Sequence, residues 1–216
     1  PAGAAAAALQ RGDPARALEL LEASAATIAS DASAQLVLGH VHAARNASGP
    51  ALAAYERALT LDVELGDDPK LRAALRAMAG STDGAVVAQA FDLWVGRTDD
   101  PEAKKLVVLG AVSDDLARRK AVRAVIERRR LGDRVDWLRA YSLDLEQDTP
   151  CEARREAVAK LRALGDPRAV AALERAVVRT GDLGLQRGRR VTGPINGCLV
   201  DDAKAAIGYL RGLPPP

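Results

Sequence analysis

Aromatic residues, histidine, cysteine and methionine are scarce in this chain of 216 residues. Aromatic residues make up 3% of it, and it contains 2 His, 2 Cys and 1 Met. His40 and His42 stand two positions apart, whereas two zinc ligands on one helix need a spacing of three or four residues. No candidate nucleophile stands beside a base. We therefore expect no metal site, no cofactor and no catalytic residue in this chain.

Long apolar segments and strand-like patterns are also missing. No apolar run approaches the roughly 20 residues that a membrane helix needs, so we expect no membrane insertion by this chain. Runs that alternate apolar and polar residues, which would indicate strands, are nearly absent. Alanine, the best helix former, supplies most of a hydrophobic fraction of 48%. The composition therefore predicts an all-α fold.

Helix starts are well marked, because Asp or Thr directly precedes Pro at five places in the chain. The first side chain can accept a backbone N–H of the first turn, and Pro suits the first helical position. These pairs begin at Asp13, Asp68, Asp100, Thr149 and Asp166. We expect helices at 2–10, 14–27, 32–45, 50–63, 69–79, 83–96, 101–112, 114–130, 133–146, 150–164, 167–179 and 198–211.

The first half contains a repeat. Ala17, Ala51 and Ala85 are each 34 residues apart, which is the period of the tetratricopeptide repeat (TPR). Residues 32–63 resemble that family through Leu38-Gly39, Ala51-x3-Tyr55 and Ala58-Leu59. The resemblance implies TPR-like repeats over 1–64, the first of them truncated, and a degenerate repeat over 65–98. A chain that starts inside a repeat, without Met, is expected to be part of a longer bacterial protein.

The second half has a different pattern. Residues 153–173, with Leu-Gly-Asp-Pro at a turn, resemble a bacterial HEAT repeat, and residues 117–133 echo them. The resemblance implies HEAT-like pairs over 99–180, with 150–164 and 167–179 forming one pair. Residues 181–196 are expected to be an irregular loop rich in Gly and Arg, and 197–216 a terminal helix with a Pro-rich end. The whole chain is predicted to be a right-handed α-solenoid of antiparallel helix pairs.

The order of these blocks is similar to helical regions at the C-terminus of some bacterial eukaryotic-type serine/threonine kinases. The ending Asn196-Gly-Cys-Leu199, followed by Ala206-Ile-x-Tyr-Leu210, supports that resemblance. It implies a regulatory module of a signalling protein. No kinase motif lies in this chain, since it has no Gly-rich phosphate loop, His-Arg-Asp or Asp-Phe-Gly.

Two functional hypotheses follow. The first is a non-catalytic scaffold that binds a protein or peptide, because stacked repeats present extended concave surfaces. The TPR resemblance implies a partner groove formed by Ser33, Leu36, His40, Ala43 and Ala44.

The second hypothesis is an anion or nucleic-acid site in the basic run between residues 118 and 134. The net charge is only +2, and no aromatic side chains interleave to stack bases, so nucleic acid is the less favoured partner. The solvated face of a long helix is the favoured explanation of such a run. The candidate residues are Arg118, Arg119, Arg123, Arg130 and Arg134.

Cys151 and Cys198 each open a predicted helix. If these helices lie parallel and side by side, the thiols come within reach of a disulfide. The alternative is two buried free thiols in a reducing cytosol, and the sequence favours neither. The localisation is correspondingly open: cytoplasmic if the thiols are free, periplasmic or otherwise extracytoplasmic if they are bridged.

Overall fold

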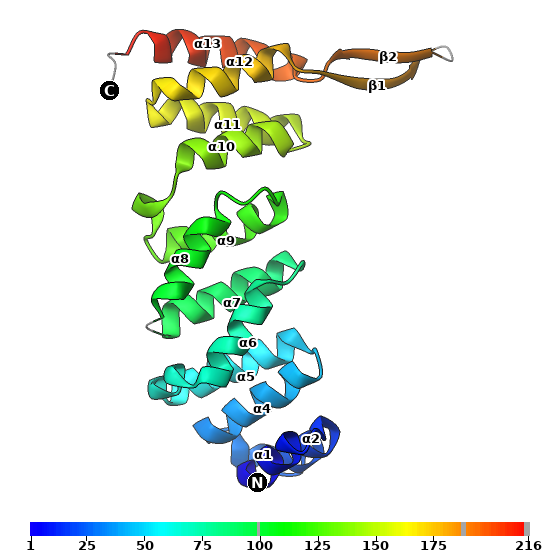
Figure 1. Cartoon of the computed structure of the whole chain (residues 1–216), viewed down its shortest axis with the longest axis vertical. Helices are drawn as coiled ribbons and strands as arrows, with labels where there is room; N and C mark the ends of the chain where they lie inside the picture. Colours follow the sequence, from blue (N-terminus) through cyan, green and yellow to red (C-terminus); the bar gives the residue numbers. More distant parts are fainter. Residues whose placement is uncertain (99, 187–188, 214–216) are drawn as a thin grey trace. The chain divides into compact units, whose positions relative to one another are not determined.

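The structure is a computed structural model that describes residues 1–98, 100–186 and 189–213 (Figure 1). Helices dominate these residues, so the all-α prediction is confirmed apart from one short hairpin. Each expected range contains an α-helix, but the single helix expected over 14–27 is divided into α2 and α3. The α-helices are α1 (Ala2–Gln10), α2 (Pro14–Glu22), α3 (Ala25–Ile28), α4 (Ala32–Ala44), α5 (Ser48–Leu61), α6 (Pro69–Ala79), α7 (Gly84–Arg97), α8 (Pro101–Gly110), α9 (Leu116–Arg128), α10 (Trp137–Gln147), α11 (Cys151–Leu164), α12 (Val170–Val178) and α13 (Val200–Arg211). Short 3-10 helices lie at η1 (Val63–Asp67), η2 (Gly132–Arg134), η3 (Pro167–Ala169) and η4 (Gly197–Leu199).

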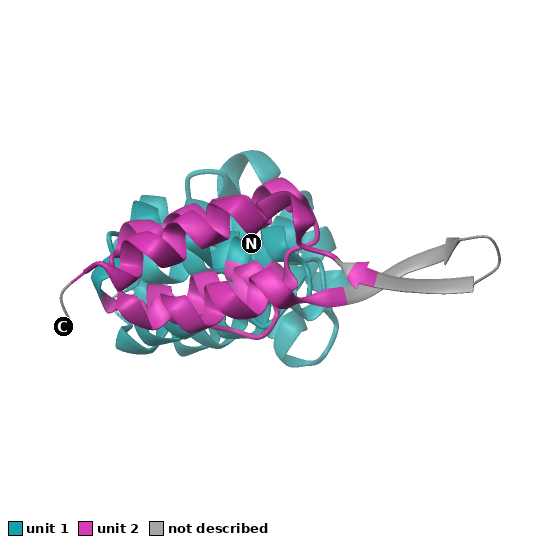
Figure 2. Cartoon of the chain, turned by 90° about the horizontal axis from the view of Figure 1, so that it is seen from above, with its two compact units in different colours: residues 1–110, 120–133 teal, residues 111–119, 134–216 magenta. Residues whose placement is uncertain are grey.

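The chain forms two compact units, coloured separately in Figure 2. Unit 1 consists of residues 1–110 and 120–133, and unit 2 of residues 111–119 and 134–216. The division therefore falls inside the segment 99–180 that the sequence assigned to HEAT-like repeats. None of the described helices is both long and apolar enough to cross a membrane.

Unit 1 contains three helical hairpins: α1 with α2, α4 with α5, and α6 with α7. Helix α4 also packs on α2 and α6, and α5 packs on α7. Local capping explains where these helices begin. The side chain of Asp13 accepts a hydrogen bond from the Arg16 amide, and that of Asp68 accepts one from Leu71. Both capping residues directly precede Pro, as the sequence pattern predicted for a helix start.

The contact between α4 and α5 is the most extensive in unit 1. Ala51, Tyr55 and Ala58 of α5 are fully buried in it. Gly39 of α4 lies directly against the Tyr55 ring, so close that a Cβ at residue 39 would lie 2.3 Å from a ring carbon. The small residues of one helix thus admit the one large ring of the other. Gly39, Ala51, Tyr55 and Ala58 are among the residues through which 32–63 resemble the TPR family.

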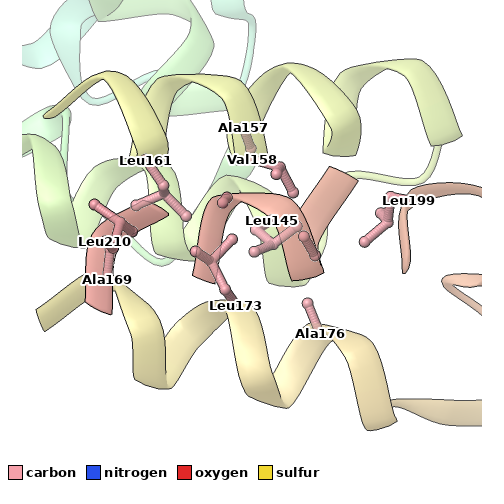
Figure 3. Packing of buried hydrophobic residues seen from close by; sticks show 11 residues of the cluster. Leu145, Ala157, Val158, Leu161, Ala169, Leu173, Ala176, Leu199 and Leu210 are labelled. Carbon is pink, nitrogen blue, oxygen red and sulfur yellow. The ribbon is translucent and has the colours of Figure 1, made fainter. Parts of the chain in front are cut away.

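Unit 2 is built from two further hairpins, α10 with α11 and α12 with α13. The expectation that α11 and α12 would form one repeat pair is wrong, because α11 packs mainly on α10 and α13, while α12 packs on α13 and α10. The core explains this arrangement. Leu161 of α11, Leu173 of α12 and Leu210 of α13 point into one apolar cluster together with Leu145 of α10 (Figure 3).

A two-stranded antiparallel hairpin joins α12 to η4. Its strands are β1 (Thr180–Gln186) and β2 (Arg189–Pro194), with Thr180 paired to Pro194 and Gln186 to Arg189. The prediction of an irregular loop over 181–196 is therefore wrong for its described part. Gly and Arg carry little strand propensity, and the hairpin arises from backbone pairing, which the composition does not show.

Candidate interaction surfaces

Helices α11 and α13 run parallel and in register. Three contacts join α11 to α13 or to η4 directly before it, and in each contact the second residue lies 47 positions after the first in sequence. Cys151 and Cys198 are at disulfide distance, with Cα atoms 6.5 Å apart. Arg155 Nε donates to Asp202 Oδ2 at 2.7 Å, and the Arg162 guanidinium lies 5.0 Å from the centre of the Tyr209 ring. The juxtaposition expected for the two cysteines is thus present.

A surface groove of about 860 Å³ follows this helix pair. Its floor is formed by small side chains, Ala159 and Ala163 of α11 and Ala205 of α13. All three alanines are exposed, although each lies within a helix. The other residues that line the groove are Glu152, Arg155, Glu156, Val158, Arg162, Asp202 and Tyr209. We call this surface the α11/α13 groove.

Three charged residues of the α11/α13 groove form ion pairs, one pair across the groove and one with Lys160 beside it. Arg155 binds Asp202 across it, and Glu156 binds Lys160 at 2.6 Å along α11. Tyr209 remains 47% exposed beneath Arg162. The groove therefore combines three exposed alanines with the Arg155–Asp202 ion pair, which joins the two helices, and with the exposed Tyr209 ring. Such a surface suits contact with another side chain or helix.

The partner groove expected on α4 is only partly open. Ser33 and Ala44 are exposed and Ala43 is half-buried, but Leu36 is buried and His40 is largely enclosed. That expectation is therefore wrong for Leu36 and His40, because both side chains serve the packing around α4.

His40 connects α4 to both α5 and α6. Its Nδ1 is 2.9 Å from the Tyr55 hydroxyl, and its Nε2 is 3.6 Å from Asp68 Oδ1. Burial lowers the pKa of His40, although Asp68 opposes this effect, and the nearby Lys70 adds to it. Burial and Asp68 both raise the pKa of Tyr55, so its phenol stays protonated. The Tyr55 hydroxyl is fully enclosed, and the network is structural.

Arg119 does not belong to a surface anion patch, contrary to expectation. Its side chain is completely buried, and its Nε donates to Asp144 Oδ1 at 3.0 Å. Its Nη1 donates to the Ser113 carbonyl oxygen at 2.6 Å. A buried guanidinium needs such partners, because leaving it unpaired would be strongly unfavourable. Arg119 therefore ties α9 to α10 inside unit 2.

The rest of the basic run is divided between the two units. Arg123 and Arg130 belong to unit 1, whereas Arg118 and Arg134 belong to unit 2. Arg118 and Arg123 both make interactions within the structure. Further along, Arg128 and Arg129 pair with Asp92, at 2.7 and 3.0 Å respectively. Much of the positive charge of this segment is thus matched by carboxylates that are distant in sequence.

Acidic and metal-binding chemistry also finds little support. Asp13, Asp68 and Asp115 use their carboxylates to cap helices. Among the described residues, no group of three or more His, Cys, Asp and Glu side chains is arranged to hold a metal ion.

Sequence analysis missed the α11/α13 groove and a smaller pocket near Asn196. Ala159 and Ala163 are four residues apart and therefore lie on one face of α11, and Ala205 lies on α13. Alanine is so common in this chain that this spacing did not indicate a site. The pocket combines residues from three segments, and only the folded chain brings them together.

No family model, no curated protein and no solved structure matches this chain.

Proposed function

We propose that this chain is a non-catalytic scaffold that binds proteins or peptides through its helical hairpins. The observation that carries the proposal is the α11/α13 groove, a large surface hollow of about 860 Å³ floored by exposed alanines. Several described carboxylates cap helices or form ion pairs. We therefore expect the chain to recognise a partner mainly by the shape of its surface. Such a module would serve within a larger bacterial signalling protein, arranged as TPR-like and HEAT-like repeats of a right-handed solenoid.

An amphipathic helix is the occupant that the α11/α13 groove fits best. Small side chains on the floor let a third helix approach closely, at the usual distance of about 8–10 Å between axes. The exposed Tyr209 ring supplies an anchor of the kind that dominates protein interfaces. This is the helix-in-groove mode of peptide recognition, in which apolar residues at helical spacing fill the groove.

The test is selection from a displayed library of amphipathic peptides of about 18 residues, which span about 27 Å as a helix. Binding of selected peptides is then measured by fluorescence anisotropy. Ala159→Arg should fill the groove and weaken binding at least about tenfold, equal to about 1.4 kcal/mol. Ala171→Arg is the matched control, because Ala171 is an exposed alanine of α12 outside the groove.

Selected peptides that bind the wild-type protein and the Ala171→Arg variant equally, but lose affinity for Ala159→Arg, would support the proposal. A library that yields no binder sensitive to Ala159→Arg would refute the α11/α13 groove as the interaction surface. The anion-binding alternative is not favoured by the geometry, because Arg119 is buried and Arg128 and Arg129 are paired.

A further inference from the structure

A second hollow lies in unit 2, where the ends of α10 and α12 meet the segment that enters η4. It encloses about 360 Å³, which matches one or two amino-acid side chains in size. It is lined by Leu145, Glu146, Arg175, Ala176, Val178, Arg179 and Asn196. We call it the Asn196 pocket. It shares no lining residue with the α11/α13 groove.

Asn196 is the unusual member of this pocket. The residue is only 1% exposed, and its Nδ2 donates to the Ala176 carbonyl oxygen at 2.8 Å. Its Oδ1 is buried, and it has no hydrogen-bond partner in the part of the chain that the structure describes. The bond to Ala176 fixes the orientation of the amide, because a flipped amide would place two oxygen atoms against each other.

A buried acceptor without a donor is unfavourable, so most such groups in folded proteins are bonded to protein, water or ligand. An apolar residue of similar size would avoid this penalty, although it would also lose the bond to Ala176. Asn196 is one of six residues with such a buried, unpartnered side-chain atom among those described, and it is distinguished by lining a pocket. A ligand that presents an N–H group in this pocket would supply the missing donor. A peptide main chain supplies such a group at nearly every residue.

The remaining lining residues define what surrounds that N–H group. Leu145 and Ala176 form an apolar wall, and Val178 is 74% exposed at the rim. Arg175 binds the Glu146 carboxylate at 3.1 Å. Arg179 instead donates to the main-chain carbonyl oxygen of Glu146, which carries no charge. The two guanidinium groups and one carboxylate leave the rim with an excess of positive charge.

We propose that the Asn196 pocket binds an extended peptide segment in which an apolar side chain precedes an acidic one. The apolar side chain packs against Leu145 and Val178, and a main-chain N–H of the peptide donates to Asn196 Oδ1. The acidic side chain lies at the rim beside Arg175 and Arg179. This inference rests on the proposed scaffold function and adds a second, smaller recognition site to it.

The probe is a panel of acetylated and amidated peptides of about eight residues, about 27 Å when extended. One set carries Leu-Glu at the centre, and a matched set carries Leu-Lys. Binding is measured by fluorescence anisotropy, and the site is mapped by NMR chemical shifts, including the side-chain amide of Asn196. We expect saturable binding of the Leu-Glu set, a shift of the Asn196 amide signals, and at least about tenfold weaker binding of the Leu-Lys set.

Variants then separate the contributions. Val178→Glu should weaken the Leu-Glu set at least about tenfold, whereas Val63→Glu, at another strongly exposed valine, should not. Arg175→Glu should reverse the preference between the two sets, with Arg168→Glu as the control for charge. Asn196→Leu should weaken both sets. The exposed Val178 keeps the test decisive even if Asn196→Leu fails to fold.

Two results would overturn the inference. One is failure of both peptide sets to bind the folded wild-type protein. The other is binding that Val178→Glu and Arg175→Glu leave unchanged, with shifts that map to the α11/α13 groove. Neither result would refute the scaffold function, which is tested separately by helical peptides and the Ala159→Arg variant. Conversely, helical peptides that bind the wild-type protein and the Ala159→Arg variant equally, together with normal binding of the Leu-Glu set, would refute only the groove.

Discussion

Opening the link between Cys151 and Cys198 should destabilise unit 2 strongly. The two residues are 47 positions apart in sequence, and a bridge between them closes a loop that contains α11, α12 and the hairpin. A cross-link of this length lowers the entropy of the unfolded chain by an amount worth about 4 kcal/mol at 25 °C. The bridge also fixes the start of α13, whose apolar face completes the core of unit 2.

The assay uses one tryptophan in each unit. Trp94 lies in unit 1 and Trp137 in unit 2, so a Trp94→Phe background makes fluorescence report on unit 2. Urea unfolding is measured with and without reductant, and intact mass confirms the loss or gain of two hydrogens. With a slope of about 2 kcal/mol per M urea, a loss of about 4 kcal/mol moves the midpoint down by about 2 M.

The Cys151→Ser, Cys198→Ser double variant is the control. It should unfold at the midpoint of the reduced protein and should not respond to reductant. Two free thiols in the protein that has not been treated with reductant would refute the bridge itself. A bridged protein whose midpoint is the same with and without reductant would refute the entropic argument.

Three further perturbations test the core, and one tests the surface. Arg119→Met should cost about 3–5 kcal/mol, because it removes the Arg119 guanidinium from the buried Asp144 carboxylate; adding Asp144→Leu should restore part of the loss in urea unfolding, and no restoration would contradict the ion-pair argument. Gly39→Ala should lower stability by about 1–3 kcal/mol despite the higher helix propensity of Ala, because the new methyl meets Tyr55; a raised melting temperature by circular dichroism would show that α4 and α5 are not in this close contact. The pKa of His40 is lower in the folded state than its ordinary 6.5, so the unfolded state binds more protons and stability should fall as the pH drops below about 6.5; His40→Gln should flatten that part of the profile in pH-dependent unfolding, and an unchanged profile would exclude His40 as the source. Mobility shifts with duplex DNA should show weak binding with a shallow dependence on salt, whereas tight binding with a steep salt dependence would support the basic run as a nucleic-acid site.

Local chemistry in the sequence was sufficient to place the helices. Asp68 and Asp166 precede Pro and cap their helices through their own carboxylates, as expected from the residue pairs alone. The repeat spacing also singled out Gly39, Ala51 and Tyr55, which the structure places at the buried interface of α4 and α5. These features depend on residues within one turn or one hairpin, so a linear pattern contains the necessary information.

The sequence could not give the pairing of helices in unit 2. Both α11 and α12 carry apolar stripes, and either α10 or α12 could have been the main partner of α11. The choice depends on which stripes fill one core together, and Leu145 of α10 and Leu210 of α13 join that core from distant parts of the chain. The hairpin between α12 and η4 was missed for a similar reason, since strand pairing is formed between backbones and not within one segment.

The candidate sites separate in the same way. The sequence placed Cys151 and Cys198 near the starts of two helices and left open whether they meet; the parallel packing of α11 and α13 decides that they do. Only the tertiary structure decided that Arg119 is buried against Asp144, 25 residues away, while other arginines of the same run remain at the surface. It alone buried the Asn196 side chain with its amide nitrogen bonded to Ala176 and its amide oxygen without a donor among the described residues. Charge and polarity are properties of a residue, but burial and partnership are properties of its neighbours, and those neighbours are set by folding.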